Sequence, residues 1–289
     1  MAASEPLPSE IVATANEKSR RLRELVLAPE ILVMPGAWDA LTAILFEHLG
    51  FPAVQGSSAA IAAALGYPDG EITGRERTVD VTRQIASAVS VPVNADGERG
   101  YGGPDEVGVT VRSLVEAGAA GMNLEDSLPA EGQRGLAPIP NQLEKIAAVM
   151  DTKRALGSEF FLNARVDAFA VMAGDTKSAL EEAIKRGNAY AEAGADCIFY
   201  LGASDRDAIA TLVKEVAAPV SIFAVADTPS VAELQELGVA RVSYGSAFQR
   251  FALAALRRFA EGIGEPGGHA AMREGMSGRE LQDMLRKGL

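Results

Sequence analysis

Acidic side chains follow two neighbouring apolar runs of this sequence, at the point where each run ends. Asp96 and Glu98 close one run, and Glu125 closes the next run along the chain. A spacing of two places Asp96 and Glu98 on one face if both lie in a strand. Carboxylates packed together raise one another's pKa or recruit a cation, and oxygen ligands alone suit Mg2+ or Mn2+. The three acids are therefore candidate metal ligands, or they only solvate loops.

An arginine lies inside the apolar segment FFLNARVDAF. Arg165 needs a carboxylate partner there, because a charged side chain is rarely buried alone. Asp167 and Glu125 are candidate partners within the protein. The planar guanidinium group is also suited to binding a substrate carboxylate through two parallel hydrogen bonds. The spacing alone leaves the structural and the substrate-binding interpretations open.

The chain offers few side chains for nucleophilic or imidazole chemistry. Its single cysteine, Cys197, lies in an apolar run and is predicted to be a packed thiol. One cysteine excludes an intramolecular disulfide and a cysteine-rich zinc site. His48 lies in a helical pattern and His269 in the C-terminal tail, and neither is a candidate general base.

Eight short apolar runs predict strands that are buried on both faces. They are residues 31–39, 52–58, 91–98, 120–127, 159–167, 195–204, 218–227 and 240–247. Between them, apolar residues spaced three and four apart predict helices, as in 40–50, 106–119, 178–195 and 231–240. This alternation favours one α/β domain over residues 1–289, a (β/α)8 TIM barrel. The rival, a doubly wound open sheet, would usually carry a glycine-rich phosphate loop, which is absent.

The barrel places its active site at the C-terminal ends of the strands, where the acids and Arg165 fall. Residues 1–25 are expected to add an N-terminal helix. Residues 262–289 are expected to form a C-terminal extension outside the barrel, with a loop followed by a helix at 278–287.

Charge and composition exclude several classes of protein. The chain has 289 residues and a formal net charge of -12, so it should repel the phosphates of nucleic acids. It has no apolar stretch long enough to span a membrane, and its N-terminus lacks the apolar core of a secretory signal. We therefore expect a cytoplasmic protein with neither a nucleic-acid nor a membrane partner.

Five segments in this order resemble the isocitrate lyase / phosphoenolpyruvate mutase superfamily. They are PAVQGSSAA, YPDGEIT, NADGERGYGG, MNLEDS and NARVDAF, and the resemblance covers roughly residues 30–255. It implies a (β/α)8 barrel, often with a helix exchanged between the subunits of a dimer or tetramer. The extension 262–289 would then lie between subunits of a homo-oligomer.

The resemblance also implies a role for each acidic candidate. Asp96 and Glu98 would hold Mg2+ directly or through water, and Glu125 would stand beside them on the next strand. Asp69, in the loop that follows YPD, would lie near the water shell of the metal.

Residues that would hold a small carboxylate substrate follow from the same resemblance. Arg165 would bind the substrate carboxylate. The serine and backbone amides that hold a 2-oxo acid would be those of Gly56, Ser57 and Ser58.

Residues 128–140 depart from the lyases of this superfamily. Those enzymes carry a Lys-Lys/Arg-Cys-Gly-His motif here, on a mobile loop whose cysteine supplies a proton. This chain reads LPAEGQRGLAPIP, with neither cysteine nor histidine, and Gln133 lies near the place of the cysteine. We expect this segment to be a gating loop and Gln133 to take part in catalysis through hydrogen bonds only.

The resemblance implies a pyruvate-like enolate held on Mg2+ as the shared intermediate. Cleavage of a carbon–carbon bond does not need the cysteine in every case. We therefore expect a Mg2+-dependent lyase that cleaves a carbon–carbon bond of a small 2-oxo or 2-hydroxy carboxylic acid. The alternatives are carbon–phosphorus chemistry, of the phosphonomutase or phosphonopyruvate hydrolase type, and a non-catalytic barrel that binds a metabolite.

Overall fold

Strands and helices alternate along most of the chain. The computed structural model describes residues 6–128 and 135–286. The strands are β1 (Leu32–Met34), β2 (Gly36–Ala37), β3 (Val54–Gly56), β4 (Val93–Asp96), β5 (Gly121–Glu125), β6 (Phe161–Val166), β7 (Cys197–Tyr200), β8 (Val220–Phe223) and β9 (Arg241–Ser243). The helices are α1 (Ser9–Leu27), α2 (Ala40–His48), α3 (Ser58–Ala64), α4 (Arg75–Ala88), α5 (Pro104–Glu116), α6 (Ile139–Leu156), α7 (Ala168–Val171), α8 (Thr176–Glu192), α9 (Arg206–Glu215), α10 (Val231–Glu236), α11 (Ala247–Gly262), η1 (Gly268–Glu274) and α12 (Gly278–Arg286).

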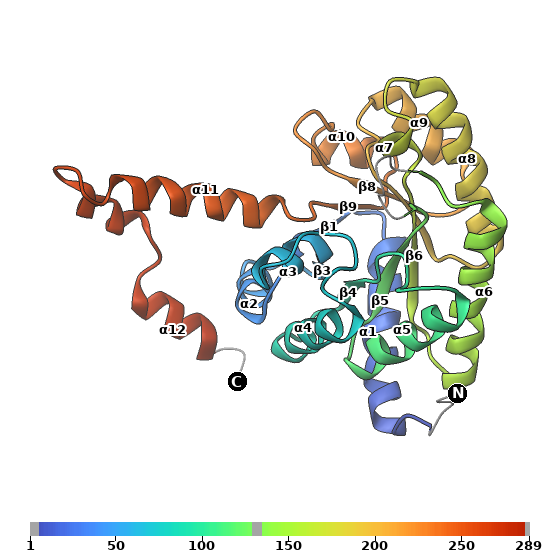
Figure 1. Ribbon diagram of the computed structural model, residues 1–289, viewed down its shortest axis with the longest axis horizontal. Coiled ribbons are helices and arrows are strands. Elements are labelled where there is room, and N and C mark those ends of the chain that lie inside the picture. Colours follow the sequence, from blue (N-terminus) through green and yellow to red (C-terminus); the bar gives the residue numbers. More distant parts are fainter. Residues whose placement is uncertain (1–5, 129–134, 287–289) are drawn as a thin grey trace.

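The strands form one parallel sheet that curls into a barrel with helices around it (Figure 1). The strand order is β1-β9-β8-β7-β6-β5-β4-β3-β2, and each pair of neighbours is parallel. β1 and β2 are two halves of the first expected strand. β1 pairs with β9 and β2 pairs with β3, so this strand connects the two edges of the sheet. The predicted (β/α)8 barrel is confirmed.

The expectation of one continuous strand at 31–39 is wrong, because the strand breaks at Pro35. Proline has no N–H to donate to a ladder. The Pro35 carbonyl still accepts the N–H of Gln55 at 2.9 Å, so the break remains tied to β3. Gly36 follows the break, and a Cβ there would collide with the carbonyl oxygen of Gly245. The first strand can therefore bend from one neighbour to the other only with glycine at this position.

Helix α5 shows why these segments fold as they do. It begins at Pro104, whose missing N–H costs nothing in the first turn. Val107, Val111 and Leu114 are three or four residues apart and are buried against the barrel. The chain leaves the helix through Gly118, which has a φ of 83°, a backbone conformation that favours glycine.

The barrel interior below the site is polar rather than aliphatic. The buried side chains of Gln55, Asn94, Asn123, Asn163 and Arg241 come from five different strands. Asn94 Nδ2 donates to Gln55 Oε1 at 3.1 Å and to Asn123 Oδ1 at 3.0 Å. Asn163 Nδ2 donates to Asn123 Oδ1 at 2.7 Å, and Arg241 Nη2 donates to Gln55 Oε1. This network holds the strands in register just beneath their C-terminal ends.

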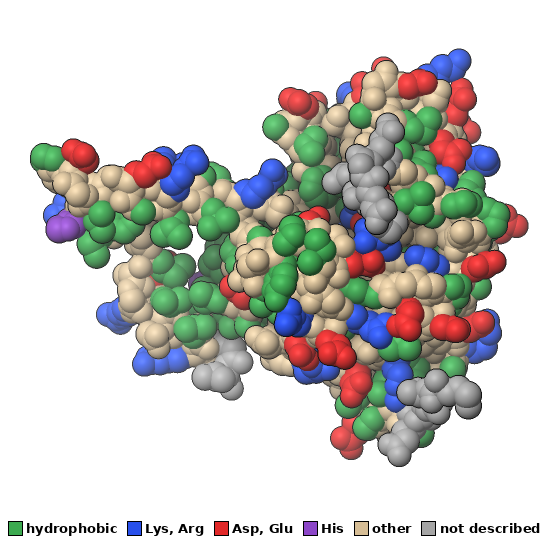
Figure 2. Space-filling view, viewed as in Figure 1, with side chains coloured by type: hydrophobic (Ala, Val, Ile, Leu, Met, Phe, Trp, Pro, Cys, Tyr) green, Lys and Arg blue, Asp and Glu red, His purple; other side chains and the backbone are tan. Residues whose placement is uncertain are grey.

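The C-terminal part of the chain leaves the barrel from α11 onward (Figure 1). Helix α11 projects away from the body of the molecule, and α12 folds back toward α2, against which it makes contacts (Figure 1). Met284 of α12 is only 3% exposed, whereas Phe251 of α11 is 75% exposed. Figure 2 shows hydrophobic side chains gathered along this arm. The arm thus carries apolar surface that its own chain leaves uncovered.

The single cysteine lies inside the protein. Cys197 is buried, and burial raises the pKa of its thiol to about 12, so the prediction of a packed thiol is confirmed. Within the described ranges, no helix combines the length and the apolar character needed to cross a membrane.

Candidate active site

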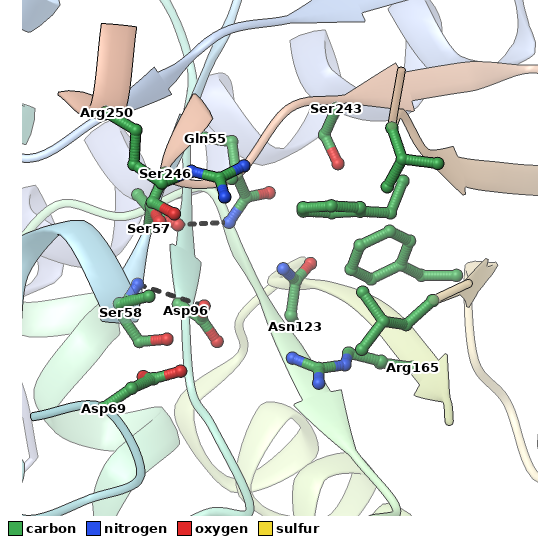
Figure 3. Close-up of a pocket in the computed structure, with 17 residues that line it drawn as sticks. Gln55, Ser57, Ser58, Asp69, Asp96, Asn123, Arg165, Ser243, Ser246 and Arg250 are labelled. Carbon is green, nitrogen blue, oxygen red and sulfur yellow. Dashed lines mark hydrogen bonds between the residues drawn. The ribbon is translucent and has the colours of Figure 1, made fainter. Parts of the chain in front are cut away.

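Two adjoining hollows open at the C-terminal ends of the strands. The first has a volume of about 360 Å³ and the second about 350 Å³. Ser58, Asp69 and Arg165 line both, so the two hollows form one site. In Figure 3, Ser58, Asp69 and Asp96 face the first hollow from one side and Arg165 from the other. The predicted acids and the predicted arginine therefore meet across a shared space.

Asp96 and Glu98 lie together, but for a different reason from the expected one. β4 ends at Asp96, and Glu98 adopts a φ of 47° in the turn that follows. Strand alternation therefore does not place the two side chains on one face, and that expectation is wrong. Asp96 Oδ1 instead accepts the N–H of Glu98 at 3.2 Å, and a Gly100 N–H to Gly97 carbonyl bond closes the turn.

Glu98 lies in a strongly acidic environment. Its side chain is buried, and burial raises its pKa to about 8, with further increases from Asp96, Asp69, Glu71 and Glu125. Carboxylates that raise one another's pKa in this way need either a shared proton or a cation.

These acids fit a hard cation, with one restriction on how it is held. Across residues 6–128 and 135–286, no group of three His, Cys, Asp or Glu side chains is arranged to hold a metal ion directly. Mg2+ commonly uses one or two carboxylates and keeps several waters. The donor set is therefore suited to Mg2+ or Mn2+ held partly through water rather than by three direct carboxylate ligands.

Arg165 pairs with both of its candidate carboxylates. Its Nε and Nη2 donate to the two oxygens of Asp167 at 2.6 and 2.8 Å, and its Nη1 lies 2.5 Å from Glu125 Oε2. Burial raises the pKa of Glu125 to about 7. The Arg165 cation and the hydrogen bond that Ser127 donates to Glu125 both oppose this increase. The structural interpretation of Arg165 is confirmed, and the substrate-binding interpretation remains a prediction.

The segment Gly56, Ser57 and Ser58 lines the first hollow, although part of its hydrogen-bonding capacity is used within the protein. Ser57 Oγ accepts the N–H of Ala60 at 3.4 Å and so caps α3. The Ser58 N–H donates to Asp96 Oδ2 at 3.1 Å, which ties this segment to the acidic cluster. The Ser58 amide is thus a partner of Asp96 here, a contact that the sequence does not reveal.

The remaining predicted residues differ in what the structure says of them. Asp69 is exposed and lines both hollows, facing the acidic side. Gln133 lies outside the described residues, so its role stays a prediction. At the base of that loop, Leu128 N–H donates to the Gly135 carbonyl at 2.8 Å.

Several site residues are missed by reasoning from the sequence. Phe199, Leu201, Phe223 and Val225 form an apolar part of the lining of the first hollow, and Arg250 lines it from α11. The signal that could have found the first four is their place at the C-terminal ends of β7 and β8. Arg250 is carried by a helix, and no local pattern points to it.

Comparison with known proteins identifies the family. The family described as phosphoenolpyruvate phosphomutase matches residues 22–264, which is most of the chain. The chain belongs to this family. The superfamily resemblance read from the five segments is therefore confirmed.

Relatives within the phosphoenolpyruvate mutase family carry different chemistry in their names. The chain is 37% identical over 215 residues to carboxyvinyl-carboxyphosphonate phosphorylmutase of Arabidopsis thaliana, covering 72% of this chain and 62% of that protein. It is 34% identical over 192 residues to 2-methylisocitrate lyase of Bacillus subtilis, covering 65% and 60%. The chain thus spans about three fifths of the length of the first curated relatives it matches.

Among solved structures, an oxaloacetate acetylhydrolase in complex with 3,3-difluorooxalacetate is similar over nearly the whole fold. Its TM-score is 0.81 at 28% identity, covering 98% of this chain and 94% of that chain. Proteins similar to this chain therefore include ones named as a phosphorylmutase, a lyase and an acetylhydrolase.

Proposed function

We propose that this protein is a divalent-metal-dependent lyase that cleaves a carbon–carbon bond of a small 2-oxo or 2-hydroxy carboxylic acid through an enolate. The observation that carries the proposal is the placement of Asp69 and Asp96 opposite Arg165 in a shared site that Glu98 and Glu125 also line. Relatives named 2-methylisocitrate lyase and oxaloacetate acetylhydrolase support the same class of reaction.

The acidic cluster would hold the metal. Asp96 and Glu98 would bind it, with Asp69 and Glu125 nearby to accept hydrogen bonds from its waters. A bound Mg2+ would neutralise the negative charge that develops on the substrate oxygen. Glu98 and Glu125 are buried, so water screens their charges less than it would charges at the surface.

Arg165 is suited to orient the substrate carboxylate. A guanidinium group has five N–H donors, and the contacts to Asp167 and Glu125 use three of them. The bidentate contact to Asp167 holds the Nε edge of the group. One N–H on each terminal nitrogen then remains to donate to a substrate carboxylate.

A test of this function is a screen of 2-oxo and 2-hydroxy diacids and phosphonopyruvate with Mg2+, with products detected by NMR. Carbon–carbon cleavage predicts a new 2-oxo acid or its partner fragment. The carbon–phosphorus alternative, which the Arabidopsis phosphorylmutase supports, predicts a new phosphorus signal instead. A folded protein without any Mg2+-dependent product across the panel would favour a barrel that only binds metabolites.

Asp96→Asn is expected to abolish Mg2+-dependent turnover while the fold survives. The substitution keeps the size of the side chain and can still accept the Ser58 N–H, but it removes the charge and replaces the oxygen that accepts the Glu98 N–H. Calorimetry should show Mg2+ binding weakened in parallel. Asp151→Asn, in an exposed pair with Arg154 on α6, is the matched control and should behave as wild type. Unchanged Mg2+ affinity in Asp96→Asn would show that this carboxylate is not a metal ligand.

We further propose that the chain is a homo-oligomer, dimer or tetramer, in which the extension 262–289 and α11 pack on a neighbouring subunit. Phe251 and Leu256 of α11 are 75% and 61% exposed, a large apolar surface for a single chain.

The double variant Phe251→Asp, Leu256→Asp is expected to give the mass of a monomer by light scattering, because the charges would have to be buried at the interface. Arg257→Glu on the same helix is the control and should keep the oligomer. A monomeric wild-type protein at micromolar concentration would contradict the proposal.

A further inference from the structure

Three non-glycine residues of the described chain have a positive φ, and all three lie around the acidic side of the site. They are Glu71 at 70°, Glu98 at 47° and Tyr101 at 61°. Side chains disfavour this conformation, and it persists where surrounding contacts enforce it. Glu71 belongs to the loop that carries Asp69, whereas Glu98 and Tyr101 belong to the loop after β4.

The Glu71 carboxylate joins these two loops. Its Oε1 accepts the backbone N–H of Arg99 at 3.1 Å and that of Tyr101 at 2.8 Å. Its Oε2 accepts Arg99 Nη2 at 2.9 Å, and the Gly70 carbonyl accepts the same nitrogen at 3.2 Å. One carboxylate thus satisfies three donors of the other loop, and we call this set of contacts the Glu71–Arg99 clamp.

The clamp is anchored on its far side as well. Lys145 of α6 donates to the Arg99 carbonyl at 2.7 Å. Arg99 Nη1 lies 3.6 Å from Glu125 Oε1, so the same side chain reaches the end of β5. The Arg99 and Glu71 side chains are only 13% and 19% exposed, so water screens the pair less than it would a surface pair.

The clamp lies next to two of the proposed metal-side acids. Asp69 is two residues before Glu71, and Glu98 is directly before Arg99. Tyr101, whose N–H is held by Glu71, donates its own hydroxyl to Glu98 Oε1 at 3.2 Å. The Arg99 cation also offsets repulsion among the carboxylates gathered there.

We propose that Glu71 and Arg99 are positioning residues that hold the Asp69 loop and the Glu98 loop together, and so assemble the metal side of the site. This inference rests on the proposed function, because it assigns the clamp to the same acidic cluster. Neither residue need touch the substrate or the metal. A purely structural ion pair between two loops would stabilise the fold without changing the affinity of the site for Mg2+.

Glu71→Gly is the informative variant, because glycine adopts a positive φ without strain while the carboxylate is lost. Arg99→Met removes the other partner. Arg75→Met is the matched control: Arg75 Nη1 lies 2.5 Å from Glu106 Oε2, and this pair joins α4 to α5 away from the hollows.

The first readout is hydrogen exchange of the metal-free protein. Glu71→Gly should lose protection at the amides of Arg99 and Tyr101, whereas Arg75→Met should keep it. The second readout is Mg2+ affinity by calorimetry, which should fall about 10- to 100-fold in both clamp variants, as for other groups that orient metal ligands.

Wild-type exchange at these amides together with wild-type Mg2+ affinity in the clamp variants would overturn the proposal. Both readouts are independent of turnover. A wild-type protein that binds Mg2+ but cleaves none of the acids would therefore contradict the proposed function and leave the clamp to be judged on its own measurements.

Discussion

Arg165→Met is expected to lower kcat/KM for the true substrate by about 100- to 1000-fold, the effect of removing a preorganised donor from an active site. The guanidinium is held by Asp167 and Glu125, so its remaining N–H groups are positioned before the substrate binds. Steady-state kinetics on a substrate found in the NMR screen provides the measurement.

Arg165→Lys serves as the second variant, because it keeps the charge beside Glu125 and Asp167 but loses the planar fork. It should fold and still show a large loss. Arg154→Met, at an exposed pair on α6, controls for a general effect of removing arginine. Wild-type kcat/KM in folded Arg165→Lys would show that bidentate binding of the substrate is not the role of this residue.

Arg186→Met is expected to lower the free energy of unfolding by about 3–5 kcal/mol, because it leaves a buried carboxylate without its cation. Asp126 is fully buried, and its Oδ2 accepts Arg186 Nη1 at 3.0 Å and the Tyr190 hydroxyl at 2.8 Å. Burial raises the pKa of Asp126, and the hydrogen bonds and Arg186 oppose that change. Urea unfolding measures the loss of stability.

The same network reaches the active site. Asp126 Oδ1 accepts the N–H of Asp167 at 2.9 Å, and Asp167 in turn orients Arg165. Lys185→Met, at the exposed neighbour of Arg186, is the control and should change stability little. If Arg186→Met unfolded at the same urea concentration as the control, the buried pair would not be important for stability.

The adjacent residues Glu125 and Asp126 show which features of the site the sequence reveals and which it does not. Both end the same apolar run, and only the structure separates the acid that faces the site from the acid that braces α8. The strand itself is predictable, because β5 at Gly121–Glu125 lies within the expected run 120–127. The apolar run that predicts a strand buried on both faces can be read from neighbouring residues. The amphipathic spacing that predicts α12 can be read in the same way.

The details of the site depend on contacts between distant segments. The bond from the Ser58 N–H to Asp96 joins residues 38 positions apart, and the Arg99 amide reaches Glu71 across 28 positions. The left-handed turn at Glu98 also reflects the loop that packs on it rather than a preference of glutamate for that conformation. Residue type and strand position therefore identify the acids, while their geometry comes from long-range packing.

Stabilisation of a 2-oxo acid enolate at this site can be tested without knowing the substrate. By microscopic reversibility, a site that releases pyruvate from its enolate must also form that enolate from pyruvate. The measurement is exchange of the pyruvate methyl protons in D2O, followed by proton NMR. We expect exchange to be accelerated by the wild-type protein with Mg2+, and to fall to the buffer rate with Asp96→Asn or without Mg2+. Exchange at the buffer rate for pyruvate and 2-oxobutyrate alike, with folded, Mg2+-saturated wild-type protein, would show that this site does not stabilise a pyruvate-type enolate.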